Sequence, residues 1–138
     1  MEADEPKPTS KPKGRRALLV ADSDPWVQDP VAGFLRQAGY EVLAASDGLD
    51  TVAVLEEHAE EIVAVLMDSN IPGDSGDEIF ADIRRIRPNI PIIMMSGFSD
   101  QDVMGRFMGM GVVGFLKKPF GPLTLFQVVQ KVLDHPAA

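Results

Sequence analysis

Five apolar runs that alternate with segments of helical spacing constrain the fold of this chain more than any other feature. The runs are rich in Val, Ile, Leu, Ala and Met, and they lie at residues 17–20, 40–46, 62–68, 90–97 and 112–118. Short apolar runs of this kind predict strands that are covered on both faces of a parallel sheet. The sequence therefore predicts an α/β fold, a three-layer, doubly wound sheet of five parallel strands with helices on both faces.

The segments between the runs predict the helices. Apolar residues recur there at every third or fourth position, as in Ile79, Ile83 and Ile86, and Gly or Pro residues lie near the ends. In the second of these segments we expect Leu49 and Leu55, with two valines between them, to face the core. The expected helices lie within residues 24–39, 49–61, 71–88, 100–111 and 121–135.

Length and charge limit the domain organisation. The 138 residues suffice for one domain with its own core. Residues 1–16 are polar, with five basic and three acidic residues, so we expect a disordered tail or linker there and one domain at 17–138. Subtracting these from the 13 basic and 21 acidic residues of the chain leaves a formal charge of −10 on the domain. Such a domain is expected to repel nucleic acid.

Targeting signals and cysteines are absent from the sequence. No stretch approaches about 18 uncharged apolar residues, so we expect no membrane contact by this chain. The first residues lack the apolar segment of a secretion signal. The absence of cysteine fits a reducing compartment, and we expect a cytoplasmic location.

Polar residues follow four of the five predicted strands at the point where each ends. Asp22, Ser23 and Asp24 follow the first strand, and Asp68 ends the third. Ser96 and Lys118 lie at the ends of the fourth and fifth. The carboxyl ends of parallel strands meet at one edge of the sheet, so these side chains are expected to converge there. The acids after the first strand could hold a metal ion, act as a nucleophile or cap the next helix.

Five motifs in order resemble the receiver domain of two-component response regulators, over residues 17–134. The motifs are "LLVADSDP" (18–25), "GYEVLAASDG" (39–48), "VLMDSNIPGDSG" (65–76), "IIMMSG" (92–97) and "GVVGFLKKPF" (111–120). Each motif is weak alone, but five at fitting intervals are specific. The resemblance implies a flavodoxin-like fold with strand order 2-1-3-4-5.

The resemblance also implies a chemistry. A phosphoryl group would pass from a histidine of a histidine kinase or phosphotransfer protein to Asp68, the acceptor. Mg²⁺ would be held by Asp22, Asp68 and the backbone carbonyl of Asn70, and Lys118 would pair with the acceptor carboxylate. The Lys118–Pro119 peptide bond would be cis, as is seen in the family. Such a domain modifies itself and is not a conventional enzyme.

Switching is implied in the same way. Ser96 would move toward the phosphoryl group, and Phe115 would change its rotamer with it. The signal would leave through the face of the fourth helix, fifth strand and fifth helix, either to a downstream protein or by homodimerisation. The chain would be either a stand-alone regulator or the receiver of a hybrid sensor kinase.

One position departs from the family pattern. The family has two adjacent acids after the first strand, and here they fall at Asp22 and Ser23. Loss of a carboxylate is expected to weaken Mg²⁺ binding, unless Asp24 reaches the ion directly or through water. Ser23 also supports an alternative, a pseudo-receiver that acts by protein contact without phosphorylation. A remote alternative is an aspartate-nucleophile phosphatase, but nothing acidic and glycine-bearing follows Lys118 as its last motif requires.

Overall fold

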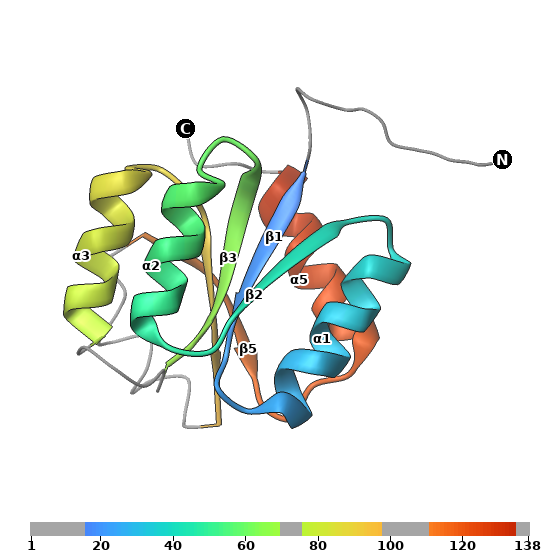
Figure 1. Ribbon diagram of the computed structural model, residues 1–138. Helices are drawn as coiled ribbons and strands as arrows, with labels where there is room; N and C mark the ends of the chain where they lie inside the picture. Colours follow the sequence, from blue (N-terminus) through green and yellow to red (C-terminus); the bar gives the residue numbers. More distant parts are fainter. Residues whose placement is uncertain (1–15, 70–75, 98–110, 135–138) are drawn as a thin grey trace, which may run out of the picture.

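The computed structural model describes residues 16–69, 76–97 and 111–134 as a three-layer sandwich around a parallel sheet. The sheet order is β2-β1-β3-β4-β5, which confirms the predicted doubly wound fold. Helices α2 and α3 cover one face, and α1 and α5 cover the other (Figure 1). The elements are β1 (Ala17–Ala21), α1 (Pro25–Gln37), β2 (Glu41–Ala45), α2 (Gly48–Glu57), β3 (Ile62–Asp68), α3 (Gly76–Ile86), β4 (Ile92–Ser96), β5 (Val112–Lys117) and α5 (Pro122–Asp134). Of the helix expected within residues 100–111 and the tail expected at 1–16, residues 100–110 and 1–15 lie outside the described residues.

The core consists of two clusters, one on each face of the sheet. Successive residues of a strand point to opposite faces, so Leu19 packs into one cluster while Leu18 and Val20 pack into the other. All five residues of β1 are fully buried. The continuous apolar run of this strand is therefore explained by its central place between two helical layers.

The expected core face of α2 is confirmed at Leu55 and wrong at Leu49. Leu49 is 72% exposed, whereas Leu55 is buried and Thr51 is buried beside it. The helix begins at its N-cap Asp47, whose side chain accepts the Asp50 N–H at 2.7 Å. From that start, residues 48, 51 and 55 form the buried stripe, and Leu49 lies about 100° away from it. Thr51 can be buried because its hydroxyl donates to the Asp47 carbonyl at 2.6 Å.

Two arginines, one in the last turn of α3 and one directly after it, bind the loops at the amino ends of the strands. The Arg84 guanidinium donates to the carbonyls of Pro88 at 3.1 Å and Ile90 at 2.8 Å, and across the layer to Gly111 at 3.1 Å. The Arg87 guanidinium donates to the carbonyl of Ile62 at 2.8 Å and to that of Ala59. This edge is therefore held together by side-chain bonds to backbone. None of the described helices is long and apolar enough to span a membrane.

Candidate phosphoacceptor site

The ends of four strands place the predicted residues in one row. Ala21 pairs with Met67, so the next residues, Asp22 and Asp68, lie side by side where β1 and β3 end. Ser96, the last residue of β4, pairs with Lys117 of β5, and Lys118 follows. The predicted convergence at the carboxyl edge of the sheet is confirmed for Asp22 and Asp68 with Lys118.

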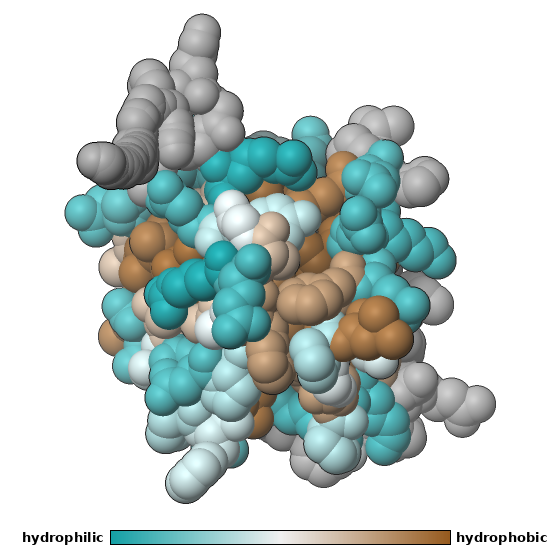
Figure 2. All heavy atoms as spheres, turned by 90° about the vertical axis from the view of Figure 1, so that its right-hand side faces the viewer, coloured by the Kyte–Doolittle hydropathy of each residue, from teal (hydrophilic) through white to brown (hydrophobic). Residues whose placement is uncertain are grey.

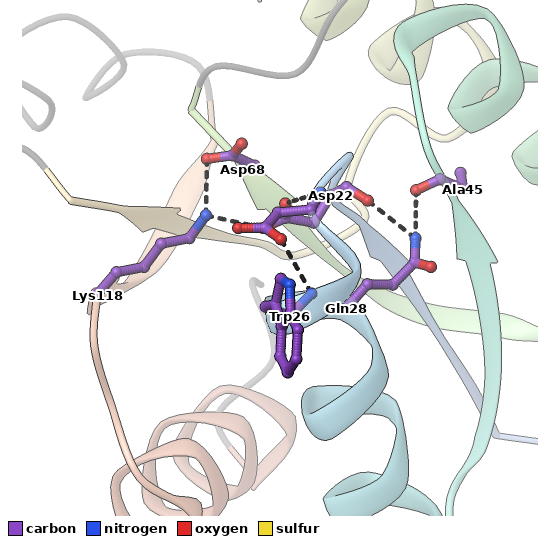
Figure 3. A network of polar contacts seen from close by, with 7 residues as sticks. Asp22, Trp26, Gln28, Ala45, Asp68 and Lys118 are labelled. Carbon is purple, nitrogen blue, oxygen red and sulfur yellow. Dashed lines mark hydrogen bonds and ion pairs between the residues drawn. The ribbon is translucent and has the colours of Figure 1, made fainter.

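Lys118 joins the two carboxylates. Its Nζ donates to Asp22 Oδ2 at 2.8 Å and to Asp68 Oδ1 at 3.2 Å (Figure 3). Asp22 is completely buried and Asp68 is 8% exposed, so both acids are shielded by the fold. The Lys118–Pro119 peptide bond is cis, as the resemblance implied.

The charge state of Lys118 follows from two opposing effects. Burial alone would lower the pKa of this ammonium. The hydrogen bond to Asp22 and the charges of Asp68 and Asp22 outweigh burial and raise the pKa above its ordinary value. The lysine is therefore a cation at neutral pH, and the site carries two carboxylates against one ammonium.

Ser23 and Asp24 lie outside this pair. Both are exposed at the start of α1. The Asp24 side chain is the N-cap of α1, and its Oδ1 accepts the Trp26 N–H at 2.9 Å. The two acids of the first loop therefore have different roles. Asp22 contacts Lys118 in the site, and Asp24 caps the helix.

The donor set fits a hard cation. Two neighbouring carboxylates supply only oxygen, and Mg²⁺ is held in proteins by one or two carboxylates with carbonyl oxygens and water. One negative charge is left in excess after Lys118 is counted. Among the described residues, no group of three or more His, Cys, Asp or Glu is arranged to hold a metal. Asn70, whose carbonyl was predicted as a ligand, lies outside the described residues.

The two predicted switch residues lie on neighbouring strands. Ser96 is fully buried at the end of β4. Phe115 is half-buried in β5 and packs against the core cluster on the α2 and α3 side of the sheet. The register pairs Phe115 of β5 with Met94 of β4, and Met94 lies two residues before Ser96. Phe115 therefore lies two positions before the carboxyl edge of the sheet.

Gln28 of α1 contacts the site but was not identified from the sequence. Its Nε2 donates to the backbone carbonyls of Asp22 at 3.0 Å and Ala45 at 2.8 Å. The signal available was a half-buried amide six residues after Asp22, on a helix that otherwise presents apolar residues to the sheet. Spacing alone does not show that such an amide turns back toward the preceding strand.

An apolar groove opens beside Lys118, between α1 and the loop that joins β5 to α5. Its volume is about 160 Å³, and Trp26, Pro30, Phe34 and Phe120 are among the residues that line it, together with Lys118. Figure 2 views this side of the molecule and shows apolar surface between hydrophilic patches. The ring of Trp26 belongs to this surface rather than to the core, since the residue is 87% exposed.

Comparison with known proteins identifies a family. The model of the response regulator receiver domain matches residues 18–130. The chain is 31% identical over 123 residues to the uncharacterized transcriptional regulatory protein YbdJ of Bacillus subtilis, covering 89% of this chain and 52% of YbdJ. The chain thus spans about half the length of such curated relatives.

Solved structures give the same result. A response regulator receiver domain protein from Clostridium thermocellum superposes with a TM-score of 0.79 at 26% identity, covering 87% of this chain and 95% of that one. The receiver domain of the hybrid histidine kinase CckA superposes with a TM-score of 0.71 at 30% identity, covering 85% of this chain and 98% of that one.

Proposed function

Because the chain belongs to the response regulator receiver domain family, we propose that it accepts a phosphoryl group on Asp68 from a histidine kinase or a phosphotransfer protein. The observation that carries the proposal is the Lys118 ammonium, which lies within hydrogen-bond distance of both Asp22 and Asp68. It unites three residues that are distant in sequence at the edge where parallel sheets hold their sites.

The reaction is a transfer between two nucleophiles. An Asp68 carboxylate oxygen forms the new O–P bond while the N–P bond of the phosphohistidine breaks, and the imidazole nitrogen keeps the electron pair. Both reactants are anionic, and like charges about 4 Å apart repel by roughly 1–4 kcal/mol at effective dielectric constants of 80 to 20. The ammonium of Lys118 offsets this repulsion and holds an oxygen of the transferring group.

Asp22 and Asp68 would hold Mg²⁺, with the Asn70 carbonyl as the predicted third protein ligand. When bound, the ion would supply further positive charge for the phosphoryl oxygens. Ser23 lacks the carboxylate that the family has at this position, so we expect weaker Mg²⁺ binding than two adjacent acids would give. Asp24 would contribute to Mg²⁺ binding, directly or through water.

The response to phosphorylation is proposed to run through Ser96 and Phe115. Ser96 would turn its hydroxyl to the phosphoryl group, and Phe115 would follow by a change of rotamer. The face that includes β5 and α5 would then present a different surface to a downstream protein or to a second copy of the chain. Like other receiver domains, the chain would act in signalling and not as a conventional enzyme, in the cytoplasm.

The test is the intact mass of the protein after incubation with acetyl phosphate, with and without Mg²⁺. We expect a gain of one phosphoryl group that requires Mg²⁺ and is lost in Asp68→Asn. Asp29→Asn is a matched control, because Asp29 is an exposed aspartate of α1. A mass gain that survives Asp68→Asn would overturn the assignment of the acceptor.

Ser23 favours a second candidate, the pseudo-receiver that acts by protein contact alone. It predicts no mass gain in the same experiment and no response of Trp26 fluorescence to Mg²⁺. Trp26 is the single tryptophan of the chain, and its N–H is bound to Asp24 in the loop that carries Ser23. Restoring the acid with Ser23→Asp distinguishes the candidates further, because a weakened site should then bind Mg²⁺ more tightly.

A further inference from the structure

The backbone around Asp22 is completely hydrogen bonded, and one side-chain amide completes it. The Asp22 N–H donates to the Ala45 carbonyl at 3.0 Å. Asp22 Oδ1 accepts the Asp24 N–H at 2.9 Å, and Oδ2 accepts from Lys118. The remaining polar group, the Asp22 carbonyl, accepts from Gln28 Nε2 at 3.0 Å. Each of the four polar groups of a fully buried acid thus has a partner.

Gln28 also connects Asp22 to the neighbouring strand. Its Nε2 donates to the carbonyl of Ala45, the last residue of β2, at 2.8 Å, and Figure 3 shows the amide between the two carbonyls. Both partners are acceptors, which fixes the orientation of the amide, since only its nitrogen can donate. One side chain from α1 therefore holds the loop after β1 against the end of β2.

We propose that Gln28 is a positioning residue for the phosphoacceptor site, which fixes the backbone of Asp22 and thereby the ammonium of Lys118 beside Asp68. The proposal rests on the proposed function, because it deepens the role of the same site. The Gln28 amide donates to the carbonyls of Asp22 and Ala45, and Asp22 in turn binds Lys118, so Gln28 would act on the site through Asp22. Ser23 makes the position of Asp22 more important, because Asp22 is the one acid at a place where the family has two adjacent acids.

Removal of the amide has a definite physical consequence. Without Gln28 the Asp22 carbonyl is a buried acceptor with no partner, and such groups draw in water or shift until they find one. A shift of this loop changes the distance between Asp22 Oδ2 and the Lys118 ammonium, and with it the geometry that both carboxylates offer to Mg²⁺. Substitution of a residue that orients the ligands of a metal in this way typically lowers the affinity for the metal about 10–100-fold.

The test compares Gln28→Met with Gln37→Met. Methionine keeps the length and flexibility of glutamine but cannot donate, and Gln37 is an exposed glutamine at the other end of α1. Two quantities are measured well below the melting temperature: the rate of Asp68 phosphorylation by acetyl phosphate, and the Mg²⁺ concentration at half of the Trp26 fluorescence change. For Gln28→Met we expect about a tenfold slower rate and about a tenfold higher Mg²⁺ midpoint, with Gln37→Met unchanged.

A merely structural Gln28 would give a different pattern. It would lower the melting temperature, while the rate and the Mg²⁺ midpoint stayed within about twofold of those of Gln37→Met, and this would overturn the proposal. If Gln28→Met does not fold, Gln28→Asn replaces it, since that variant keeps the amide but withdraws it by one methylene. An intermediate loss in Gln28→Asn supports the proposal, and an unchanged Mg²⁺ midpoint contradicts it.

Failure of the proposed function is distinguishable from failure of this inference. If the unmodified chain gains no phosphoryl mass but still responds to Mg²⁺, the proposed function fails, and the Mg²⁺ midpoint of the unphosphorylated protein decides the role of Gln28. If it shows neither a mass gain nor a Mg²⁺ response, both the proposed function and the role of Gln28 are overturned. If the unmodified chain is phosphorylated and Gln28→Met is phosphorylated equally fast at every Mg²⁺ concentration, only the inference on Gln28 is wrong.

Discussion

The carboxyl and amino edges of the sheet use partly buried cationic side chains in different ways. At the carboxyl edge, Lys118 is shared between the carboxylates of Asp22 and Asp68. At the amino edge, Arg84 and Arg87 donate to backbone carbonyls of the loops that enter the strands. One edge therefore holds charged side chains against each other, and the other edge uses charged side chains to complete the backbone.

The difference indicates which edge can react. Backbone carbonyls bound by a guanidinium are satisfied, and their geometry is fixed by the chain, so the amino edge contributes stability. Carboxylates held by a shared ammonium keep further lone pairs for a cation or an incoming phosphorus, because each ionised carboxylate has about four acceptor sites. We therefore expect substitutions at the carboxyl edge to change the chemistry and those at the amino edge to change stability.

The largest expected effect is on the chemistry, in Lys118→Met. Loss of the ammonium leaves two neighbouring carboxylates to meet an anionic donor without a protein cation. We expect the rate of Asp68 phosphorylation to fall by about 100-fold or more, as for the removal of other preorganised electrostatic groups. The measurement is the time course of the mass gain with acetyl phosphate. Lys117→Met is the matched control, because Lys117 is exposed at the end of β5, and a similar loss there would contradict the assigned role of Lys118.

The next effect is on stability, in Gly111→Ala at the amino edge. Gly111 has a φ of +85°, and an added Cβ would overlap the Arg84 guanidinium that binds the Gly111 carbonyl. We expect the free energy of unfolding to fall by about 2–4 kcal/mol from backbone strain and overpacking. Chemical denaturation measures it.

Gly33→Ala is the contrasting variant for this edge. Gly33 lies within α1, and an added Cβ there meets no atom within 4 Å. Alanine is the better helix former by about 1 kcal/mol, so this variant is expected to be more stable than the unmodified chain. Both variants should be phosphorylated at the normal rate below their melting temperatures. A strong loss of rate in Gly111→Ala would show that the amino edge is not merely structural.

The carboxyl edge could be predicted from the sequence much better than the amino edge. Strand ends converge in any parallel sheet, so Asp22, Asp68 and Lys118 could be placed together from their positions after apolar runs. Arg84 and Arg87 carry no such signal, because an arginine bound to distant carbonyls has the same local sequence as a solvated one. Gln28 was missed for the same reason.

Finer errors have a similar cause. Leu49 was expected in the core from helical spacing, but the face of α2 that packs on the sheet is that of Gly48, Thr51 and Leu55, and Leu49 lies outside it. A shift of one residue turns a side chain by about 100° and moves it from core to solvent. Spacing thus predicts that a helix has an apolar face, and tertiary structure decides which residues form it.

A smaller effect on the free energy of unfolding is expected at alkaline pH, and it concerns Lys118 at the carboxyl edge. The pKa of Lys118 is raised in the folded state, so its contribution to stability is fully present below the ordinary value of 10.5 and is lost as pH rises through the folded pKa. The difference in unfolding free energy between the unmodified chain and Lys118→Met should be constant from pH 7 to about 10 and shrink above 10.5. Arg84 is present in both proteins and cancels. A difference that changes near pH 7 would contradict the raised pKa.

The smallest expected effect is a gain in stability from Ser69→Ala, next to the acceptor. Ser69 Oγ is buried and has no hydrogen-bond partner among the residues that the structure describes, while its backbone N–H donates to the Met95 carbonyl at 2.9 Å. An unpaired buried hydroxyl costs about 1–3 kcal/mol, and alanine removes it at little loss of volume, so we expect a gain of about 1 kcal/mol. Ser46→Ala, at an exposed serine, should change stability by less than about 0.5 kcal/mol.

The Ser69→Ala variant also tests whether the Ser69 hydroxyl has a role in phosphorylation. If Ser69→Ala is more stable and Asp68 is phosphorylated at the normal rate, the hydroxyl destabilises the folded chain and has no role in phosphorylation. If the variant is more stable but its phosphorylated form loses the phosphoryl group at a different rate, the hydroxyl acts only after phosphorylation. A less stable variant would mean that the hydroxyl has a hydrogen-bond partner in solution, and Ser69 would then belong to the groups that stabilise the carboxyl edge.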